Sequence, residues 1–123
     1  MKIHPDVIGV QSVQAYGQGW VQVAGQRIAN SLVMASSGER FAWNCSHFTE
    51  LTAEHFAQLA ALETEIVIFG SGEKLRFPAP HLTHALIEKQ IGLESMDTQA
   101  ACRTYNILAG EGRHVALALL LEN

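Results

Sequence analysis

His114-Val115-Ala116-Leu117-Ala118-Leu119-Leu120-Leu121 is the stretch of sequence that decides the fold. Every residue after its histidine is apolar, so it lacks the alternation expected of a strand with one wet face. The run is also far shorter than the roughly 20 apolar residues that cross a bilayer. We therefore predict a central strand covered on both faces, which indicates an α/β chain with helices packed against a sheet.

Upstream of that strand, helix and strand patterns alternate along the chain. Thr52 is a typical N-cap, because its hydroxyl can accept a hydrogen bond from an unpaired N–H of the first helical turn. Leu51 and Phe56 have the spacing of a hydrophobic staple, so a helix is predicted to begin here. Glu65–Phe69 is short, apolar and rich in β-branched residues, which predicts a second buried strand.

A second helix is predicted to begin at the prolines that follow this strand. Pro78 and Pro80 suit the first turn of a helix, where a missing N–H costs little. Gly92 is placed at the end of this helix as its stop signal. A short strand, Leu93–Met96, is expected directly after it.

The third predicted helix begins at Asp97 or Thr98, either of which can cap it, and ends near Gly110. The order is then helix, strand, helix, strand, helix, strand. Such an order requires crossover connections, so we expect helices on a mostly parallel or mixed sheet.

The first third of the chain has a different character. Gly17-Gln18-Gly19, Gly25-Gln26 and Ser36-Ser37-Gly38-Glu39 read as tight turns between short apolar segments. From Gln11 to Trp43 we therefore expect one meander of short antiparallel strands.

Length and composition restrict the class of protein. The 123 residues fit a single domain, with about residues 1–10 set aside as an N-terminal extension. Hydrophobic residues make up 48% of the chain, which is too many for a disordered protein. The net charge of −4 offers no basic field for phosphate backbones, so nucleic acid is not an expected partner.

The compartment is predicted from the N-terminus and the cysteines. The N-terminal residues show neither a secretory signal nor a transit peptide, and direct membrane insertion is not expected. Cys45 and Cys102 are too few for a disulfide scaffold, so we expect free thiols and a cytoplasmic protein.

The first candidate site is Gly70-Ser71-Gly72-Glu73, directly after a predicted buried strand. Loops at the carboxyl ends of strands are where open α/β sheets bind ligands, and glycines let the backbone approach an anion closely. A phosphate-binding loop should run straight into a helix, however, and residues 74–77 intervene. A tight turn that needs two glycines is the competing interpretation.

The second candidate lies on the predicted third helix. Gln99, Arg103, Asn106 and Gly110 share one polar face by the i, i+3, i+4 rule. In the functional interpretation Asp97, Thr98, Arg103 and Asn106 line a ligand-binding cleft beside the glycine loop, with Glu73 paired to Arg103. In the structural interpretation this is a capped helix with a solvated face, and the sequence leaves both open.

Metal and nucleophile candidates are weak. Cys45-Ser46-His47 and the pair His81 and His84 have ligand types that zinc could use, but no two-pair ligand spacing supports a site, so no metal and no cofactor are predicted. Ser71 lacks the strand-to-helix context of a nucleophile elbow, and Cys102 lies within a helix. No residue is assigned a catalytic role, and a non-enzyme is expected.

Together, four segments carry a family resemblance. They are Tyr16-Gly17-Gln18-Gly19-Trp20, the helix start at Leu51-Thr52, the glycine loop with Arg76-Phe77-Pro78, and Met96-Asp97-Thr98 through Cys102-Arg103-Thr104-Tyr105-Asn106. The chain resembles an uncharacterised bacterial and archaeal family whose mitochondrial members include the third assembly factor of respiratory complex I, the NADH:ubiquinone oxidoreductase. The resemblance covers about Gln11 to Leu121.

The resemblance implies a three-layer α/β domain with a mixed central sheet, in which the N-terminal β meander precedes an α-β-α-β-α-β segment. It also implies a non-enzymatic assembly or interaction factor, with protein partners that include subunits of a membrane complex. That interpretation predicts self-association and an exposed apolar or aromatic patch, with Trp20, Trp43 or Phe48 as candidate members. The alternative is a small-molecule or anion-binding protein with a polar site between the Gly70–Glu73 loop and the helix over residues 98–110.

Overall fold

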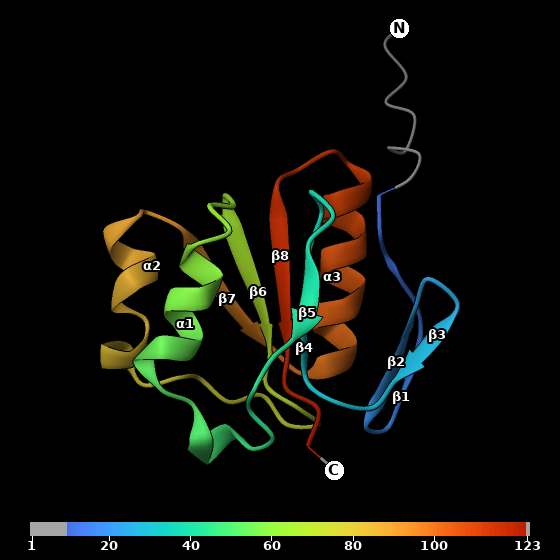
Figure 1. Cartoon of the computed structure of the whole chain (residues 1–123), viewed down its shortest axis with the longest axis horizontal. Helices are drawn as coiled ribbons and strands as arrows, with labels where there is room; N and C mark the ends of the chain where they lie inside the picture. The colour runs from blue at the N-terminus through green and yellow to red at the C-terminus, as the bar shows by residue number, and fades with distance from the viewer. Residues whose placement is uncertain (1–9, 123) are drawn as a thin grey trace, which may run out of the picture.

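The computed structural model describes residues 10–122, so the expected N-terminal extension lies almost wholly outside the described residues. Helices cover both faces of a five-stranded sheet, and a small three-stranded sheet stands beside it (Figure 1). The strands are β1 (Val13–Gly17), β2 (Trp20–Val23), β3 (Gln26–Ile28), β4 (Leu32–Ala35), β5 (Arg40–Ala42), β6 (Ile66–Gly70), β7 (Gly92–Met96) and β8 (Val115–Leu119). The helices are α1 (Ala53–Ala60), α2 (His84–Glu88) and α3 (Thr98–Gly110).

Strand β8 is the centre of the large sheet, whose order is β5-β4-β8-β6-β7. All five of its residues are buried, as the apolar run predicts. It pairs antiparallel with β4 and parallel with β6, so the sheet is mixed. The predicted strand at 65–69 is confirmed as β6, one residue later than expected, and it pairs parallel with β7.

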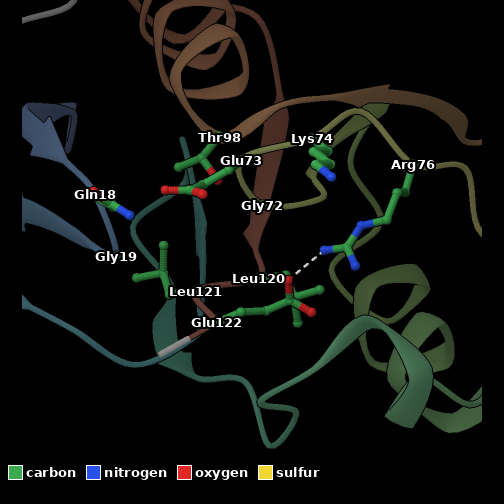
Figure 2. Close-up of a pocket in the computed structure, with 10 residues that line it drawn as sticks. All are labelled: Gln18, Gly19, Gly72, Glu73, Lys74, Arg76, Thr98, Leu120, Leu121 and Glu122. Atoms are coloured by element: carbon green, nitrogen blue, oxygen red, sulfur yellow. Dashed lines mark hydrogen bonds and ion pairs between the residues drawn. The ribbon is translucent and has the colours of Figure 1, made fainter.

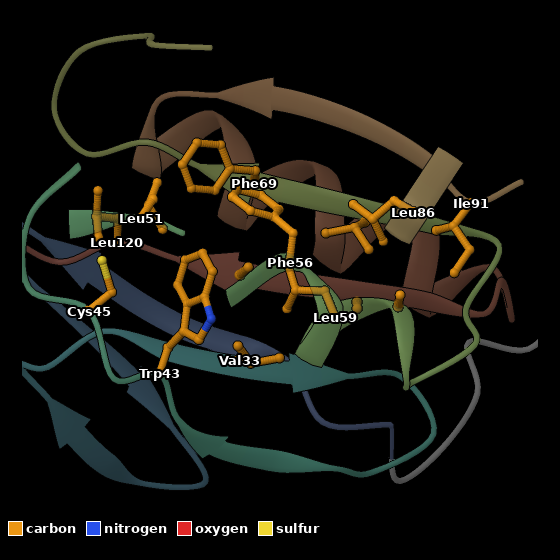
Figure 3. Packing of buried hydrophobic residues seen from close by; sticks show 14 of the residues in the cluster. Val33, Trp43, Cys45, Leu51, Phe56, Leu59, Phe69, Leu86, Ile91 and Leu120 are labelled. Atoms are coloured by element: carbon orange, nitrogen blue, oxygen red, sulfur yellow. The ribbon is translucent and has the colours of Figure 1, made fainter. Parts of the chain in front are cut away.

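The two faces of the large sheet are covered by different elements (Figure 1). On one face, α1 and α2 enclose a core in which Trp43, Phe56 and Phe69 meet edge to face at 5.9–6.1 Å between ring centroids (Figure 3). Leu51 and Phe56 are both buried here, as expected of a hydrophobic staple around the Thr52 N-cap. On the other face, α3 and the meander share a second core that includes Val21 and Tyr105. The expected three-layer α/β fold with a mixed sheet is confirmed.

The predicted meander from Gln11 to Trp43 is wrong in its extent. Only β1, β2 and β3 form the separate antiparallel sheet, whereas β4 and β5 join the large sheet beside β8. All four residues of β4 are buried. A four-residue run without a polar position needs cover on both faces, and only the interior of the large sheet offers it.

The predicted end of the second helix also differs. The helix is shorter than expected, with a 3₁₀ turn at Pro80–Leu82 followed by α2, which ends at Glu88. Gln90, with φ +57°, adopts the left-handed conformation after it, and Gly92 is instead the first residue of β7. Asn and Gly are the usual residues for that conformation, so the sequence does not predict that the helix ends with a left-handed glutamine.

The meander is attached to α3 by side chains of that helix, two of which, Arg103 and Asn106, were predicted to line a ligand site. The Asn106 amide accepts from the Val13 N–H and donates to the Val13 carbonyl, both at 2.8 Å. Tyr105 Oη donates to the Gln11 carbonyl at 2.9 Å, and Arg103 Nη1 donates to Tyr16 Oη at 3.1 Å. These contacts fix the position of the β1–β2 hairpin relative to the large sheet.

Asn106→Ala should lower the free energy of unfolding by about 1–3 kcal/mol, because it removes both partners of a part-buried backbone N–H and C=O. Urea denaturation measures the change. Gln99→Ala, an exposed amide on the same helix, is the matched control and should change stability by less than about 0.5 kcal/mol. Equal losses in the two variants would contradict the attachment role of Asn106.

Candidate functional site

Four segments meet at the carboxyl ends of the parallel strands. They are the loop after β6, the start of α3 after β7, residues 120–122 after β8, and the tip of the β1–β2 hairpin. Between them lies a main pocket of about 500 Å³ (Figure 2), and beside it a side pocket of about 390 Å³. The two pockets share Gln18, Gly19, Gly72, Glu73 and Thr98. Carboxyl ends of parallel strands are the usual place for a ligand in open α/β sheets.

The glycine loop is a tight turn held together by Ser71. The Ser71 side chain is fully buried, and its Oγ donates to the Lys74 carbonyl at 2.6 Å while accepting from the Arg76 N–H at 2.8 Å. The Ser71 N–H donates to the Met96 carbonyl at 2.8 Å. Gly72 follows with φ +106°, which L side chains rarely adopt. Ser71 is therefore fully used in shaping the loop.

The same loop is joined to the start of α3. The Thr98 N–H donates to the Gly72 carbonyl at 2.8 Å. The Asp97 carboxylate accepts from the Ala100 N–H at 2.9 Å and caps the helix. Six of the eight predicted site residues thus lie close together: Gly70, Ser71, Gly72, Glu73, Asp97 and Thr98. Of these, Glu73 is exposed and lines both pockets.

The other two predicted site residues, Arg103 and Asn106, lie further along α3 and face the meander. Asn106 is eight residues beyond Thr98, about 12 Å along the helix axis. The predicted pairing of Glu73 with Arg103 is wrong for the described residues, because the Arg103 guanidinium donates to Tyr16 instead. Periodicity placed these residues on a polar face correctly, but it could not show that the meander covers that face.

An ion pair closes one end of the main pocket. Arg76 Nη2 lies 2.6 Å from Glu122 Oε1 and also donates to the Ser71 carbonyl, while the guanidinium lies over the Phe48 ring at 4.6 Å. Glu122 Oε2 accepts from the Phe48 N–H at 2.7 Å. Burial raises the pKa of Glu122, but the hydrogen bonds from Arg76 and Phe48 together outweigh it and hold that pKa below its usual value.

The remaining candidates from the sequence do not form a reactive centre. Burial raises the pKa of Cys102 to about 12, so its thiol stays protonated at neutral pH. Cys45 Sγ donates to the His47 carbonyl at 3.1 Å, and neither cysteine is in a disulfide. Within residues 10–122, no three His, Cys, Asp or Glu side chains are grouped as metal ligands would be.

Several pocket residues were missed by the sequence analysis. Lys74 and Arg76 immediately follow the predicted loop, and their proximity to it was the available signal. Gln18 lies in a hairpin turn that was assigned only a structural role. Glu122 follows the apolar run that contains β8, and no sequence motif marks it as a pocket residue. Its position depends on pairing with a side chain 46 residues away.

One family matches this chain over residues 13–120, a range that includes every described helix and strand. Its description is "Protein of unknown function (DUF498/DUF598)". The chain belongs to this family. The resemblance seen in the sequence is therefore confirmed.

Relatives of this DUF498/DUF598 chain include two proteins named NADH dehydrogenase (ubiquinone) 1 alpha subcomplex assembly factor 3. The Bos taurus protein is 36% identical over 80 residues, which cover 63% of this chain and 44% of the relative. The Mus musculus protein is 30% identical over 110 residues, which cover 88% of this chain and 59% of the relative. The chain spans about half the length of these curated relatives.

A bacterial relative has a different name. The "13 kDa major membrane protein" of Francisella tularensis is 29% identical over 66 residues, or 54% of each chain. In the part of this DUF498/DUF598 chain that the structure describes, no helix has both the length and the apolar character that crossing a membrane requires.

Solved structures share the fold. A crystal structure of a Bordetella parapertussis protein superposes with a TM-score of 0.87 at 35% identity, covering 94% of this chain and 99% of that chain. An NMR structure from Bordetella pertussis, described as a Mth938-like domain, gives a TM-score of 0.84 at 30% identity, covering 100% of this chain and 94% of that chain.

Gly72→Ala should destabilise the loop through the ion pair. An added Cβ would lie 2.9 Å from Arg76 Nη2 and 3.3 Å from Glu122 Oε1. Gly38→Ala is the matched control, because Gly38 has φ +113° and nothing within 4 Å of an added Cβ. The left-handed backbone alone costs about 1–2 kcal/mol in either variant. We expect Gly72→Ala to lose at least about 1 kcal/mol more in urea denaturation, and equal losses would contradict this packing.

Acid should weaken the contribution of Glu122 to folding. Because its pKa is lower in the folded chain, the carboxylate stabilises the fold above about pH 4.3, the usual value for an unfolded glutamate. That contribution is lost as the pH falls through the folded-state pKa. The difference in unfolding free energy between wild type and Glu122→Gln should therefore shrink in acid. A difference that stays constant from about pH 7 to about pH 3 would show that Glu122 is not held as described.

Proposed function

We propose that this chain is a non-enzymatic assembly or interaction factor that binds protein subunits of a respiratory or other membrane complex. Two relatives that are named as assembly factors of NADH dehydrogenase support the proposal, although the chain spans only about half of their length. The two nucleophile candidates, Ser71 and Cys102, support it as well, since one is used in a turn and the other is buried and protonated.

The observation that carries the proposal is a pair of exposed apolar side chains on a fixed loop. Leu75 is 52% exposed and Phe77 is 70% exposed. Between them, the Arg76 side chain turns inward to Glu122, and the Arg76 N–H is bound by Ser71. The loop is therefore held in place while it presents both side chains to solvent.

Such a loop suits protein binding for two reasons. Burying a Leu or Phe side chain contributes about 1.5–3 kcal/mol, so two of them can dominate a small interface. A loop that is already ordered loses little conformational freedom when a partner binds.

Trp43 and Phe48 do not form the aromatic part of the predicted exposed patch. Trp43 is only 3% exposed, and Phe48 packs against the core beneath Arg76.

The second candidate function is binding of a small molecule or anion in the main pocket. Its volume of about 500 Å³ is in the range of small-molecule sites. Gly72, Glu73, Lys74 and Thr98 line it and would bind the ligand, and Asp97 lines the adjoining side pocket. Gly70 and Ser71 are buried and would contribute by shaping the loop. No catalytic residue, cofactor or metal is proposed.

We also infer a cytoplasmic location without direct insertion into the bilayer. Two buried free thiols support a reducing compartment. That the chain forms one domain and that it associates with itself both stay predictions. Gel filtration with light scattering would measure the self-association.

The proposal is tested by co-purification from the native host. An affinity-tagged wild-type chain should recover NADH dehydrogenase subunits, identified by mass spectrometry. The double variant Leu75→Ser with Phe77→Ser should recover at least about tenfold less, because each 1.4 kcal/mol of lost apolar contact is a factor of ten. Both side chains are exposed, so the fold is expected to survive, and circular dichroism checks this.

Ile107→Ser is the matched control. Ile107 is 60% exposed, between the values for Leu75 and Phe77, and lies on α3. This variant should recover the same subunits as wild type. Recovery of no such subunit by wild type, or equal recovery by the double variant, would refute the proposed function.

A further inference from the structure

Two cations at one end of the main pocket have unused hydrogen-bond donors. Arg76 uses Nη2 for both of its side-chain hydrogen bonds, to Ser71 and Glu122. Its Nη1 has no partner among residues 10–122, and its Nε–H is buried with no acceptor. Lys74 is exposed and lines the same pocket, and its ammonium likewise has no partner in the described chain.

A free acceptor lies across the pocket from Arg76. Figure 2 shows Glu73 beside Thr98 and opposite Arg76, with Gln18 on the same side. The Glu73 carboxylate is exposed and forms no ion pair within residues 10–122. Glu122, in contrast, is already bound by Arg76 and the Phe48 N–H. The pocket therefore has a donor side and an acceptor side.

Apolar residues lie between these two sides. Leu120 and Leu121 line the main pocket where the chain leaves β8. Figure 2 places both between Gln18 on one side and Arg76 on the other. Because Leu120 and Leu121 are 0% and 4% exposed, they border the pocket but offer a ligand little apolar surface. A ligand that fits this arrangement therefore needs an anionic end and an N–H donor.

We propose that the main pocket binds the carboxyl terminus of a partner polypeptide. The terminal carboxylate accepts from the Lys74 ammonium and Arg76 Nη1, and a backbone N–H of the terminal residues donates to Glu73. Capture of chain termini by convergent donors is a recurrent mode of peptide recognition. This inference rests on the proposed function, because it names the part of a partner that the chain recognises.

The balance of charge favours a carboxylate over a phosphate. Two carboxylates, Glu73 and Glu122, line the pocket with the two cations. A phosphate group carries close to two negative charges at neutral pH and would face both of them, whereas a carboxylate carries one. A carboxylate can also accept from two donors at once, which suits the free donors of Lys74 and Arg76.

NMR titration of the ¹⁵N-labelled chain tests the inference. The probe is the tripeptide acetyl-Ala-Ala-Leu with a free carboxylate, and the comparison ligand is the same peptide with an amidated terminus. Sodium acetate and sodium phosphate are titrated separately. The free acid should shift the amide signals of Gly72, Glu73 and Lys74 saturably, and the amidated peptide should bind at least about tenfold more weakly.

Lys74→Gln is the informative variant, because the Lys74 side chain supports no contact within the fold. It should weaken binding of the free-acid peptide by about tenfold. Lys89→Gln removes another exposed lysine, at the C-cap of α2, and should leave the affinity unchanged.

The outcomes separate the sources of the anionic group. Equal binding of the acid and the amide would overturn the carboxylate assignment, as would an unchanged affinity in Lys74→Gln. Acetate binding as tightly as the peptide would overturn the polypeptide assignment, and tighter binding of phosphate would overturn both. If the wild-type chain does not bind the free-acid peptide but still co-purifies with complex subunits, this inference falls and the proposed function stands.

Discussion

The burial of β8 on both faces is the constraint on which the rest of the structure depends. A strand with no polar position cannot face water on either side, so helices or other apolar surfaces must cover both. On one side α1 and α2 provide that cover, and on the other α3 and the meander do (Figure 1). Because β8 is central and parallel to β6 and β7, three strands end at one edge of the sheet.

That edge is where the molecule assembles polar groups from distant parts of the sequence. The loop after β6 and the start of α3 are joined through backbone hydrogen bonds, so their side chains have little freedom to separate. The ion pair of Arg76 and Glu122 adds the end of the chain to the same site. It also holds the segment that presents Leu75 and Phe77, so one interaction supports both the pocket and the exposed apolar loop.

Much of the candidate site followed from local sequence. Two glycines after an apolar β-branched run predicted a loop at the end of a buried strand, and Asp97 predicted a helix cap at the end of the next one. Parallel neighbours end at the same edge, so these segments had to meet once β6 and β7 were paired. The assignment of Arg103 and Asn106 failed because helical periodicity gives the face of a residue but not what covers that face. In the structure Tyr16 and Val13 cover it.

By itself, the sequence determined the elements whose signals are local: the buried strands β6 and β8, the capped start of α3 and the turns of the meander. These depend on residues that are neighbours along the chain, where apolar runs, caps and glycines act directly. Only the tertiary structure decided that β4 and β5 leave the meander for the large sheet, that Glu122 binds Arg76, and that Lys74 and Glu73 line one pocket. Those outcomes depend on which surfaces remain to be covered once β8 is buried, and no short stretch of sequence carries that information.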